Sequence, residues 1–198
     1  MIVVLVFAAA TAAAQQPRDS DRAKRLVDAA MERTTHRVSY DGAYRRIPYP
    51  GGDVPDSIGV CTDLVIRCYR VIGIDLQREV HEDMSRHFER YPRIWGLDRP
   101  DPSIDHRRVP NLQVFLDRNG TALPISRDPG DFRTGDLVTW VLPGNVPHIG
   151  IVAAGRTRDG RRPLIVHNIG AGPKCEDVLF RYEIDGHYRY FGTGEDQR

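Results

Sequence analysis

The sequence contains little that would point to nucleic-acid, membrane or cofactor binding. Its 28 Lys and Arg residues nearly balance its 27 Asp and Glu residues, which leaves a formal net charge of +1. That balance gives no electrostatic reason to expect a nucleic acid or an anionic membrane surface as partner. The chain also lacks a phosphate-binding loop, a dinucleotide fingerprint and the ligand spacing of a metal site, so we expect no cofactor and no metal.

Long hydrophobic runs are also missing, apart from one at the N-terminus. Residues 1–10 are apolar, but a membrane-spanning helix needs about 20 apolar residues, so we expect no stable membrane span. Residues 12–14 are alanines, which suits the cleavage site of a secretory signal. We therefore expect a signal peptide at 1–14 and export to the bacterial periplasm or beyond. No Lys or Arg precedes the apolar run, which leaves open a true start upstream of Met1.

Cysteine is scarce, with three residues at positions 61, 68 and 175. In an oxidising compartment an odd number leaves at least one thiol free. Cys61 and Cys68 fall on one predicted helix, roughly 10 Å apart, which is too far for a disulfide. A disulfide between Cys68 and Cys175 stays open at this point. Cys61 would then keep its free thiol.

The pattern of apolar residues indicates an α+β protein. The 198 residues suffice for one domain with a substantial core. Helical periodicity predicts helices at 20–31, 61–72, 79–91 and 112–118. Turn signals and alternation predict strands at 136–142, 148–154, 164–169, 179–184 and 188–191. Helices followed by an antiparallel sheet indicate α+β, with an N-terminal helical segment at 15–39 and one domain over 40–198.

The predicted helix that begins at Cys61 carries the first candidate for chemistry. Its apolar stripe consists of Cys61, Leu64, Val65, Cys68, Val71 and Ile72, and Asp63 falls on the far side. A thiol in the first turn of a helix lies near unpaired N–H groups and the positive end of the helix dipole. Both favour the thiolate, which is the nucleophilic form. The alternative is a small core cysteine, so the assignment requires a partner base.

Two histidines are candidates for that base. His148 opens a predicted strand directly after a turn, and His167 lies in the next strand. Neighbouring antiparallel strands can bring two such residues side by side, and a base oriented by a third polar group is the arrangement that activates a nucleophile. His167 and Asn168 point to opposite faces, so only one of them can orient the base. The alternative for each histidine is a structural hydrogen bond.

Several motifs resemble those of known proteins. Residues 59–65, 135–138, 147–152 and 165–168 are similar to the motif series of NlpC-type papain-like cysteine hydrolases. Residues 49–53, 105–112 and 167–170 more closely resemble a bacterial family called domain of unknown function 1287. The closer resemblance covers nearly all of the chain after about Tyr40, whereas the NlpC-type resemblance covers one helix and three strands.

The resemblance implies a papain-like fold, with N-terminal helices packed on a C-terminal antiparallel sheet. It implies Cys61 as nucleophile, His148 as base and His167 as the orienting group, with the backbone N–H of Cys61 in the oxyanion hole. The usual Asp-Cys-Ser-Gly motif is altered here, with valine before Cys61 and Thr-Asp after it. We therefore expect a substrate pocket different from that of a typical cell-wall endopeptidase.

The expected activity is hydrolysis of an amide bond in cell-wall peptide, as endopeptidase or amidase, by a monomer that forms a thioester at Cys61. Two alternatives remain: a non-catalytic envelope-binding protein of the same fold, and an acyltransferase that uses the same Cys/His pair. Tyr49 is also a candidate donor to the oxyanion. The residues expected to contact substrate, each with a structural role as the alternative, are Tyr49, Asp53, Asp63, Trp140 and Asn168.

Overall fold

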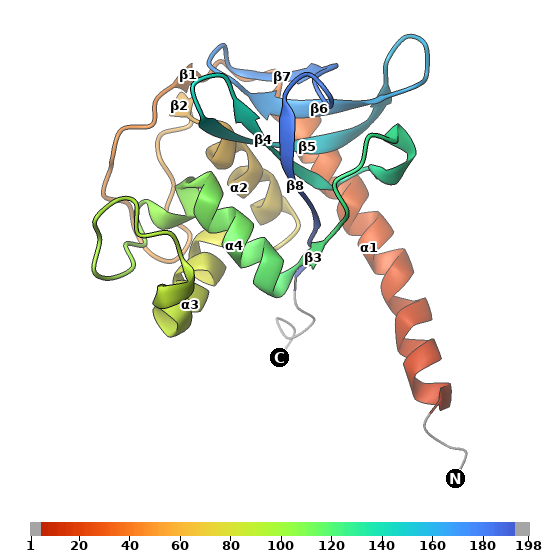
Figure 1. Cartoon of the computed structure of the whole chain (residues 1–198), viewed down its shortest axis with the longest axis horizontal. Helices are drawn as coiled ribbons and strands as arrows, with labels where there is room; N and C mark the ends of the chain where they lie inside the picture. Colours follow the sequence, from red (N-terminus) through yellow and green to blue (C-terminus); the bar gives the residue numbers. More distant parts are fainter. Residues whose placement is uncertain (1–4, 193–198) are drawn as a thin grey trace.

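The computed structural model of the chain describes residues 5–192, with side chains described from residue 18 onward. Within this range it combines α-helices with an antiparallel sheet, which confirms the α+β class (Figure 1). The helices are α1 (Leu5–Arg33), α2 (Cys61–Val71), α3 (Leu76–His87) and α4 (Val109–Asn119). The strands are β1 (Ser39–Tyr40), β2 (Ile58–Gly59), β3 (Thr121–Ala122), β4 (Leu137–Leu142), β5 (Val146–Arg156), β6 (Pro163–Asn168), β7 (Pro173–Glu176) and β8 (Glu183–Arg189).

Six of the strands form one sheet in the order β3-β8-β4-β5-β6-β7, and all of its described pairings are antiparallel. The β4–β5 hairpin turns through Gly144 and Asn145, whose φ angles of 82° and 59° lie in the left-handed region that these two residue types tolerate best. In the strand order, β5 lies between β4 and β6. The sheet thus places the predicted His148 and His167 strands side by side.

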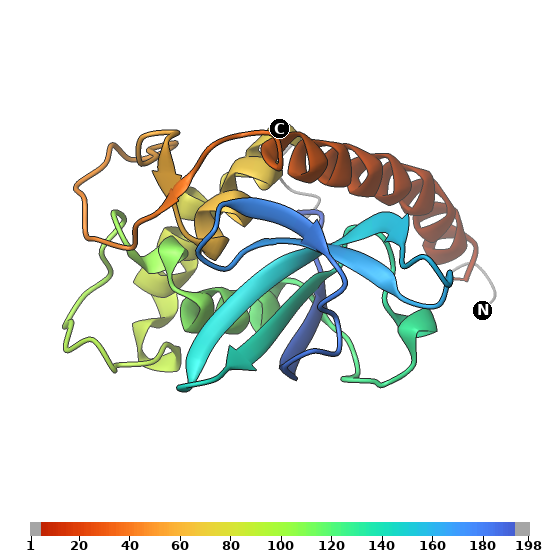
Figure 2. The ribbon, with the colours of Figure 1, turned by 90° about the horizontal axis from the view of Figure 1, so that it is seen from above.

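Both faces of the sheet are buried. On one face Ile149, Ile151 and Val166 pack into the core shared with α1, α2 and α4. On the other face Trp140 and Val152 pack against irregular segments of the chain that include Phe132, Val178 and Leu179. Seen from above, α1 runs along one side of the molecule, and the strands of the sheet lie beside it (Figure 2). Burial on two faces explains why β5 reads as a nearly continuous apolar run.

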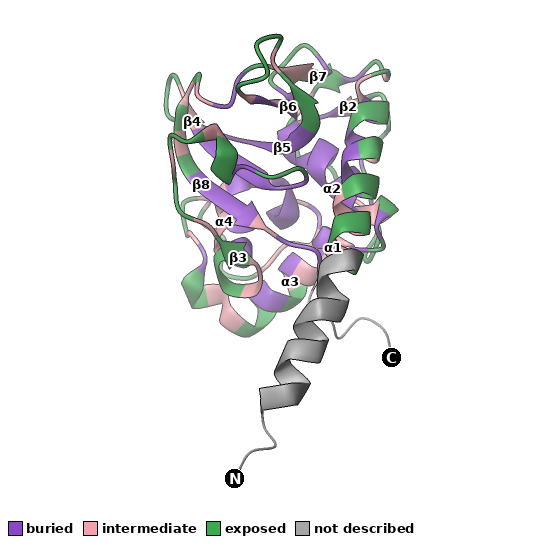
Figure 3. Ribbon diagram, turned by 90° about the vertical axis from the view of Figure 1, so that its right-hand side faces the viewer, coloured by how far each residue is buried: buried purple, intermediate pink, exposed green. Residues whose placement is uncertain are grey.

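Helix α2 begins at Cys61 as predicted, but it is buried on more sides than its stripe suggests. Every residue from Cys61 to Tyr69 is buried, Asp63 among them, and Figure 3 shows the helix inside the molecule. Val71, predicted to face inward, is 51% exposed. The polar side of α2 is buried because the loop before it binds Arg67 and the turn at 105–107 binds Thr62 and Asp63.

Other boundaries differ from the prediction for local reasons. α3 starts earlier than predicted because the Asp75 side chain caps it, accepting a hydrogen bond from the Gln77 N–H at 3.2 Å. The predicted strand at 179–184 is wrong up to residue 182, and its last two residues begin β8. Its apolar residues instead cover the second face of the sheet in irregular structure, where the Leu179 carbonyl accepts a hydrogen bond from Trp140 Nε1 at 2.9 Å. β7 was not predicted.

The N-terminal predictions have mixed outcomes. The signal peptide expected at 1–14 lies outside the residues whose side chains are described. Within α1, Leu26, Val27 and Ala30 are buried as predicted, whereas Met31 is 42% exposed and does not face the core. Among the described helices, none has the length and apolar character needed to cross a membrane.

The three cysteines are free thiols, so Cys68 and Cys175 do not form a disulfide in this structure. Cys68 is fully buried in the main core, and Cys175 packs partly against it from β7. Cys61 is 3% exposed. The free thiol expected at the start of α2 is therefore present.

Candidate active site

The chain enters α2 through a tight turn that fixes the position of Cys61. Gly59 has φ of 157°, and a Cβ on it would lie 3.1 Å from the Asp63 Cβ, so this close approach favours glycine. Val60 is the N-cap residue, and its N–H donates to the Asp63 carboxylate at 2.7 Å. Cys61 is therefore the first residue of the helix, held by a carboxylate two residues further along.

Asp63 also forms a buried ion pair. Its carboxylate accepts from Arg107 Nε at 2.7 Å and from Nη2 at 3.0 Å, and the two side chains are 3% and 2% exposed. The remaining Arg107 contacts go to the carbonyls of Asp41 and Ala43, both at 3.2 Å. Both Asp63 oxygens are thus engaged in structural contacts, and its predicted contact with substrate stays a prediction.

The histidine pair forms across β5 and β6. The strand register pairs Gly150 with His167, and His148 Nε2 lies 2.8 Å from His167 Nδ1. A Cβ on Gly150 would lie 3.1 Å from the His167 Cβ, so glycine leaves the room that the imidazole needs. Asn168 points to the other face, where its amide donates to the Gly59 carbonyl at 3.3 Å. His167, not Asn168, is therefore the group bonded to His148, and Asn168 holds the turn before Cys61.

The Cys61 sulfur meets β5 at the peptide group that joins His148 to Ile149. The Ile149 N–H hydrogen-bonds to the sulfur, as do the Thr62 N–H and the Tyr40 hydroxyl. Tyr40 reaches this position because β1 pairs with β2 in parallel, which sets Tyr40 beside Gly59. The sequence pointed to Tyr49 as the candidate donor to the oxyanion. Tyr40 was not predicted as a site residue.

Burial determines the resting protonation states of these groups. Burial raises the pKa of the Cys61 thiol to about 11, although the N–H groups of Ile149 and Thr62 oppose the shift. Burial and the neighbouring His167 lower the pKa of His148 to about 3. The lowered thiol pKa expected from the helix N-terminus is therefore wrong, because desolvation is the larger effect. At neutral pH the Cys61 thiol and both imidazoles are therefore neutral in the free protein.

A cleft of about 500 Å³ opens onto Cys61. Tyr40, Tyr44 and Trp95 give it an aromatic wall, and the Arg108 guanidinium lies 4.1 Å from the centre of the Trp95 ring. Its other lining residues are Gly42, Val60, Ile104, Arg107, Val109, Pro110, Val146 and Pro147. The two arginines of the lining already pair with Asp63 and Asp105, so the cleft offers mainly apolar surface.

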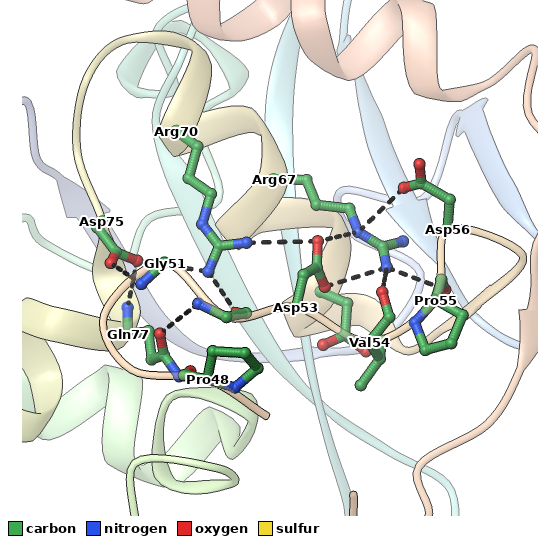
Figure 4. Close-up of polar contacts among 12 residues, drawn as sticks. Pro48, Gly51, Asp53, Val54, Pro55, Asp56, Arg67, Arg70, Asp75 and Gln77 are labelled. Carbon is green, nitrogen blue, oxygen red and sulfur yellow. Dashed lines mark hydrogen bonds and ion pairs between the residues drawn. The ribbon is translucent and has the colours of Figure 1, made fainter. Parts of the chain in front are cut away.

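The other residues expected to contact substrate do not line this cleft. Tyr49 packs against His81 with ring centroids 4.8 Å apart, and Asp53 accepts from Arg67 Nε at 2.9 Å in the network of Figure 4. Trp140 is 1% exposed and packs against His148, with ring centroids 5.9 Å apart. Asp53 therefore ties its loop to α2, and Trp140 supports the imidazole from beneath. Within the described residues, no cluster of three or more His, Cys, Asp and Glu is arranged to hold a metal ion.

These features define an α+β protein with a thiol at a helix N-terminus and a histidine pair on an antiparallel sheet. The chain belongs to the family described as Domain of unknown function (DUF1287), which matches residues 27–190. It is similar to "Uncharacterized protein YijF" of Escherichia coli (strain K12), with 50% identity over 166 residues that cover 84% of this chain and 80% of that protein. The family match spans the whole candidate site.

Proposed function

We propose that this protein is a cysteine hydrolase of papain-like, NlpC-type fold that cleaves an amide bond through a thioester at Cys61. The observation that carries the proposal is the position of the sulfur at the peptide group of His148, whose imidazole is bonded to His167. Such catalysis needs a nucleophile, a base and an orienting group; the described contacts join the base to the orienting group and the sulfur to the backbone N–H beside the base.

The reaction starts from neutral groups. As the Cys61 sulfur attacks the substrate carbonyl carbon, the thiol proton passes to His148 Nδ1. The Cys61 N–H and the Tyr40 hydroxyl stabilise the negative charge that develops on the carbonyl oxygen. The C–N bond then breaks, the leaving amine takes the proton from His148, and a thioester remains. Water attacks the thioester with His148 again as base, which releases the acid and restores the thiol.

The proposed substrate is a peptide of the bacterial cell wall, met after export. The open cleft beside Cys61 can take an extended chain, because it is about 500 Å³ in volume and lined by residues of five separate segments.

A non-catalytic envelope-binding role is the second candidate. It is favoured by the burial that raises the pKa of Cys61 to about 11, because an unreactive thiol is ordinary in a core. An acyltransferase would share every step up to the thioester and differ only in the acceptor.

Digestion of purified peptidoglycan by the full chain tests the proposal, with released muropeptides identified by mass spectrometry. We expect wild-type protein to release products and Cys61→Ala to release none. Cys175→Ala is the matched control, since it removes a thiol that lies away from the cleft. Equal release by Cys61→Ala would reject the thioester mechanism, and binding of peptidoglycan without any release would favour the envelope-binding role.

A further inference from the structure

The histidine pair continues into a third titratable group. The Nε2 atom of His167 is buried and has no hydrogen-bond partner within the described structure. The carboxylate of Glu176 faces it, with Oε2 3.6 Å from that nitrogen. Glu176 is on β7, opposite Ile165, and His167 is opposite Lys174. Residues two apart on a strand share a face, so Glu176 and His167 lie on the same face of the sheet.

This geometry couples the tautomers of the two imidazoles. A neutral imidazole carries one proton, so one nitrogen donates and the other accepts. A carboxylate only accepts, which places the His167 proton on Nε2, facing Glu176. His167 Nδ1 must then accept from His148 Nε2 across the 2.8 Å contact. His148 Nδ1 is left with a lone pair, which is the form that can remove a proton from a thiol.

We propose that Glu176 is a positioning residue that acts through His167 to hold His148 in the tautomer with an unprotonated Nδ1. This inference rests on the proposed function only where it expects a loss of kcat when Glu176 is removed. The tautomers themselves can be measured without any substrate.

The surrounding charges set the size of the effect. Burial lowers the pKa of His167, Glu176 opposes that shift, and Lys174 and Arg181 add to it. Glu176 also lies 3.8 Å from the Lys174 ammonium, and its side chain is 37% exposed. Solvent and Lys174 therefore screen its charge. We expect its removal to cost about tenfold in kcat, near the lower end of what loss of an orienting partner costs.

Imidazole nitrogen NMR of ¹⁵N-histidine-labelled full-length protein is the direct test. In wild type at pH 7.5 we expect His167 and His148 both to carry their proton on Nε2. In Glu176→Ala we expect a mixture of His167 tautomers. Glu176→Gln, whose amide oxygen can still accept, should restore the wild-type tautomer while losing the charge.

Asp177→Asn is the matched control, because Asp177 is the next residue and its carboxylate pairs with Arg162 at 2.6 Å on the surface. It should leave both imidazoles unchanged. A His167 proton on Nδ1 in wild type would overturn the proposal, and so would a Glu176→Ala spectrum identical to wild type. Thermal melting of each variant shows whether it is folded.

The two proposals fail in different ways. If His148 and His167 show the expected tautomers but the protein releases no wall peptides, the hydrolase proposal is rejected. The role of Glu176 in setting the tautomers would still stand. An active enzyme in which Glu176→Ala changes neither tautomers nor kcat would reject the positioning role and leave the hydrolase standing. A loss in kcat with KM unchanged supports positioning over substrate binding.

Discussion

His148 Nε2 and His167 Nδ1 lie 2.8 Å apart on neighbouring strands, although 19 residues separate them in the chain. The contact is buried, with the two residues 2% and 1% exposed. Each imidazole finds a partner for one of its nitrogens in the other, since unpaired polar atoms are costly in a core. The pair therefore has a defined orientation, which a catalytic base requires.

Removal of the orienting imidazole should impair turnover more than folding. We expect His167→Ala to lower kcat by about 100-fold, within the range typical of acid–base catalysis, because His148 Nε2 loses its acceptor. His167→Asn should recover part of the loss, since its amide oxygen can accept. Lys174→Ala is the control, being opposite His167 on β7. A His167→Ala enzyme with wild-type kcat would show that the pair is only structural.

The Tyr40 hydroxyl contacts the Cys61 sulfur. Tyr40→Phe should therefore lower kcat by about 10- to 100-fold, at or below the usual cost of losing an oxyanion donor. Tyr44→Phe, which also lines the cleft, and Tyr49→Phe, which does not, should each stay near wild type. The comparison of kcat among the three variants decides whether Tyr40 or Tyr49 is the donor. Equal losses in all three would contradict the assignment.

The buried ion pair of Asp63 and Arg107 should dominate local stability. Arg107→Ala leaves an uncompensated carboxylate beside Cys61, and we expect a loss of about 3 kcal/mol or more in the free energy of unfolding. Asp177→Ala breaks the Arg162–Asp177 pair, whose side chains are 36% and 41% exposed, and should cost less than about 1 kcal/mol. Urea unfolding measures both. Similar losses in the free energy of unfolding for the two variants would mean that the buried pair contributes no more to stability than the exposed one.

The raised pKa of Cys61 predicts a particular alkylation profile. A thiol with a pKa of about 11 exists as thiolate at about one part in ten thousand at pH 7, and this fraction rises about tenfold for each pH unit. Labelling by iodoacetamide, read at Cys61 by peptide mass spectrometry, should therefore keep rising beyond pH 9. The urea-unfolded chain, with an ordinary thiol pKa near about 8.5, should level off earlier. A folded profile that levels off below the unfolded one would mean a resting thiolate.

The sequence was sufficient for the parts of the fold that depend on local pattern. The start of α2 at Cys61, the β4–β5 hairpin and the adjacency of the His148 and His167 strands follow from periodicity and turn residues. The choice between His167 and Asn168 was not available from the sequence, because alternation says that they face apart but not which face meets His148.

What the sequence could not show depends on tertiary contacts. Tyr40 reaches the sulfur through a pairing of two-residue strands, too short to leave a pattern. Asp63 is buried because Arg107, 44 residues away, pairs with it. Glu176 lies on β7, a strand of four residues without alternation. At Cys61, desolvation raises the thiol pKa by more than the helix N-terminus lowers it. The sequence around Cys61 does not indicate that the thiol is so deeply buried.

The central claim is that Cys61 carries the acyl group during turnover. The most direct measurement is intact-protein and peptide mass spectrometry of full-length protein quenched in acid while it digests a defined wall peptide. The account predicts an acyl adduct on Cys61 that builds up and decays with product formation, and no adduct in Cys61→Ala or His148→Ala. Product formation that proceeds at the wild-type rate in Cys61→Ala, or an adduct on another residue, would contradict it.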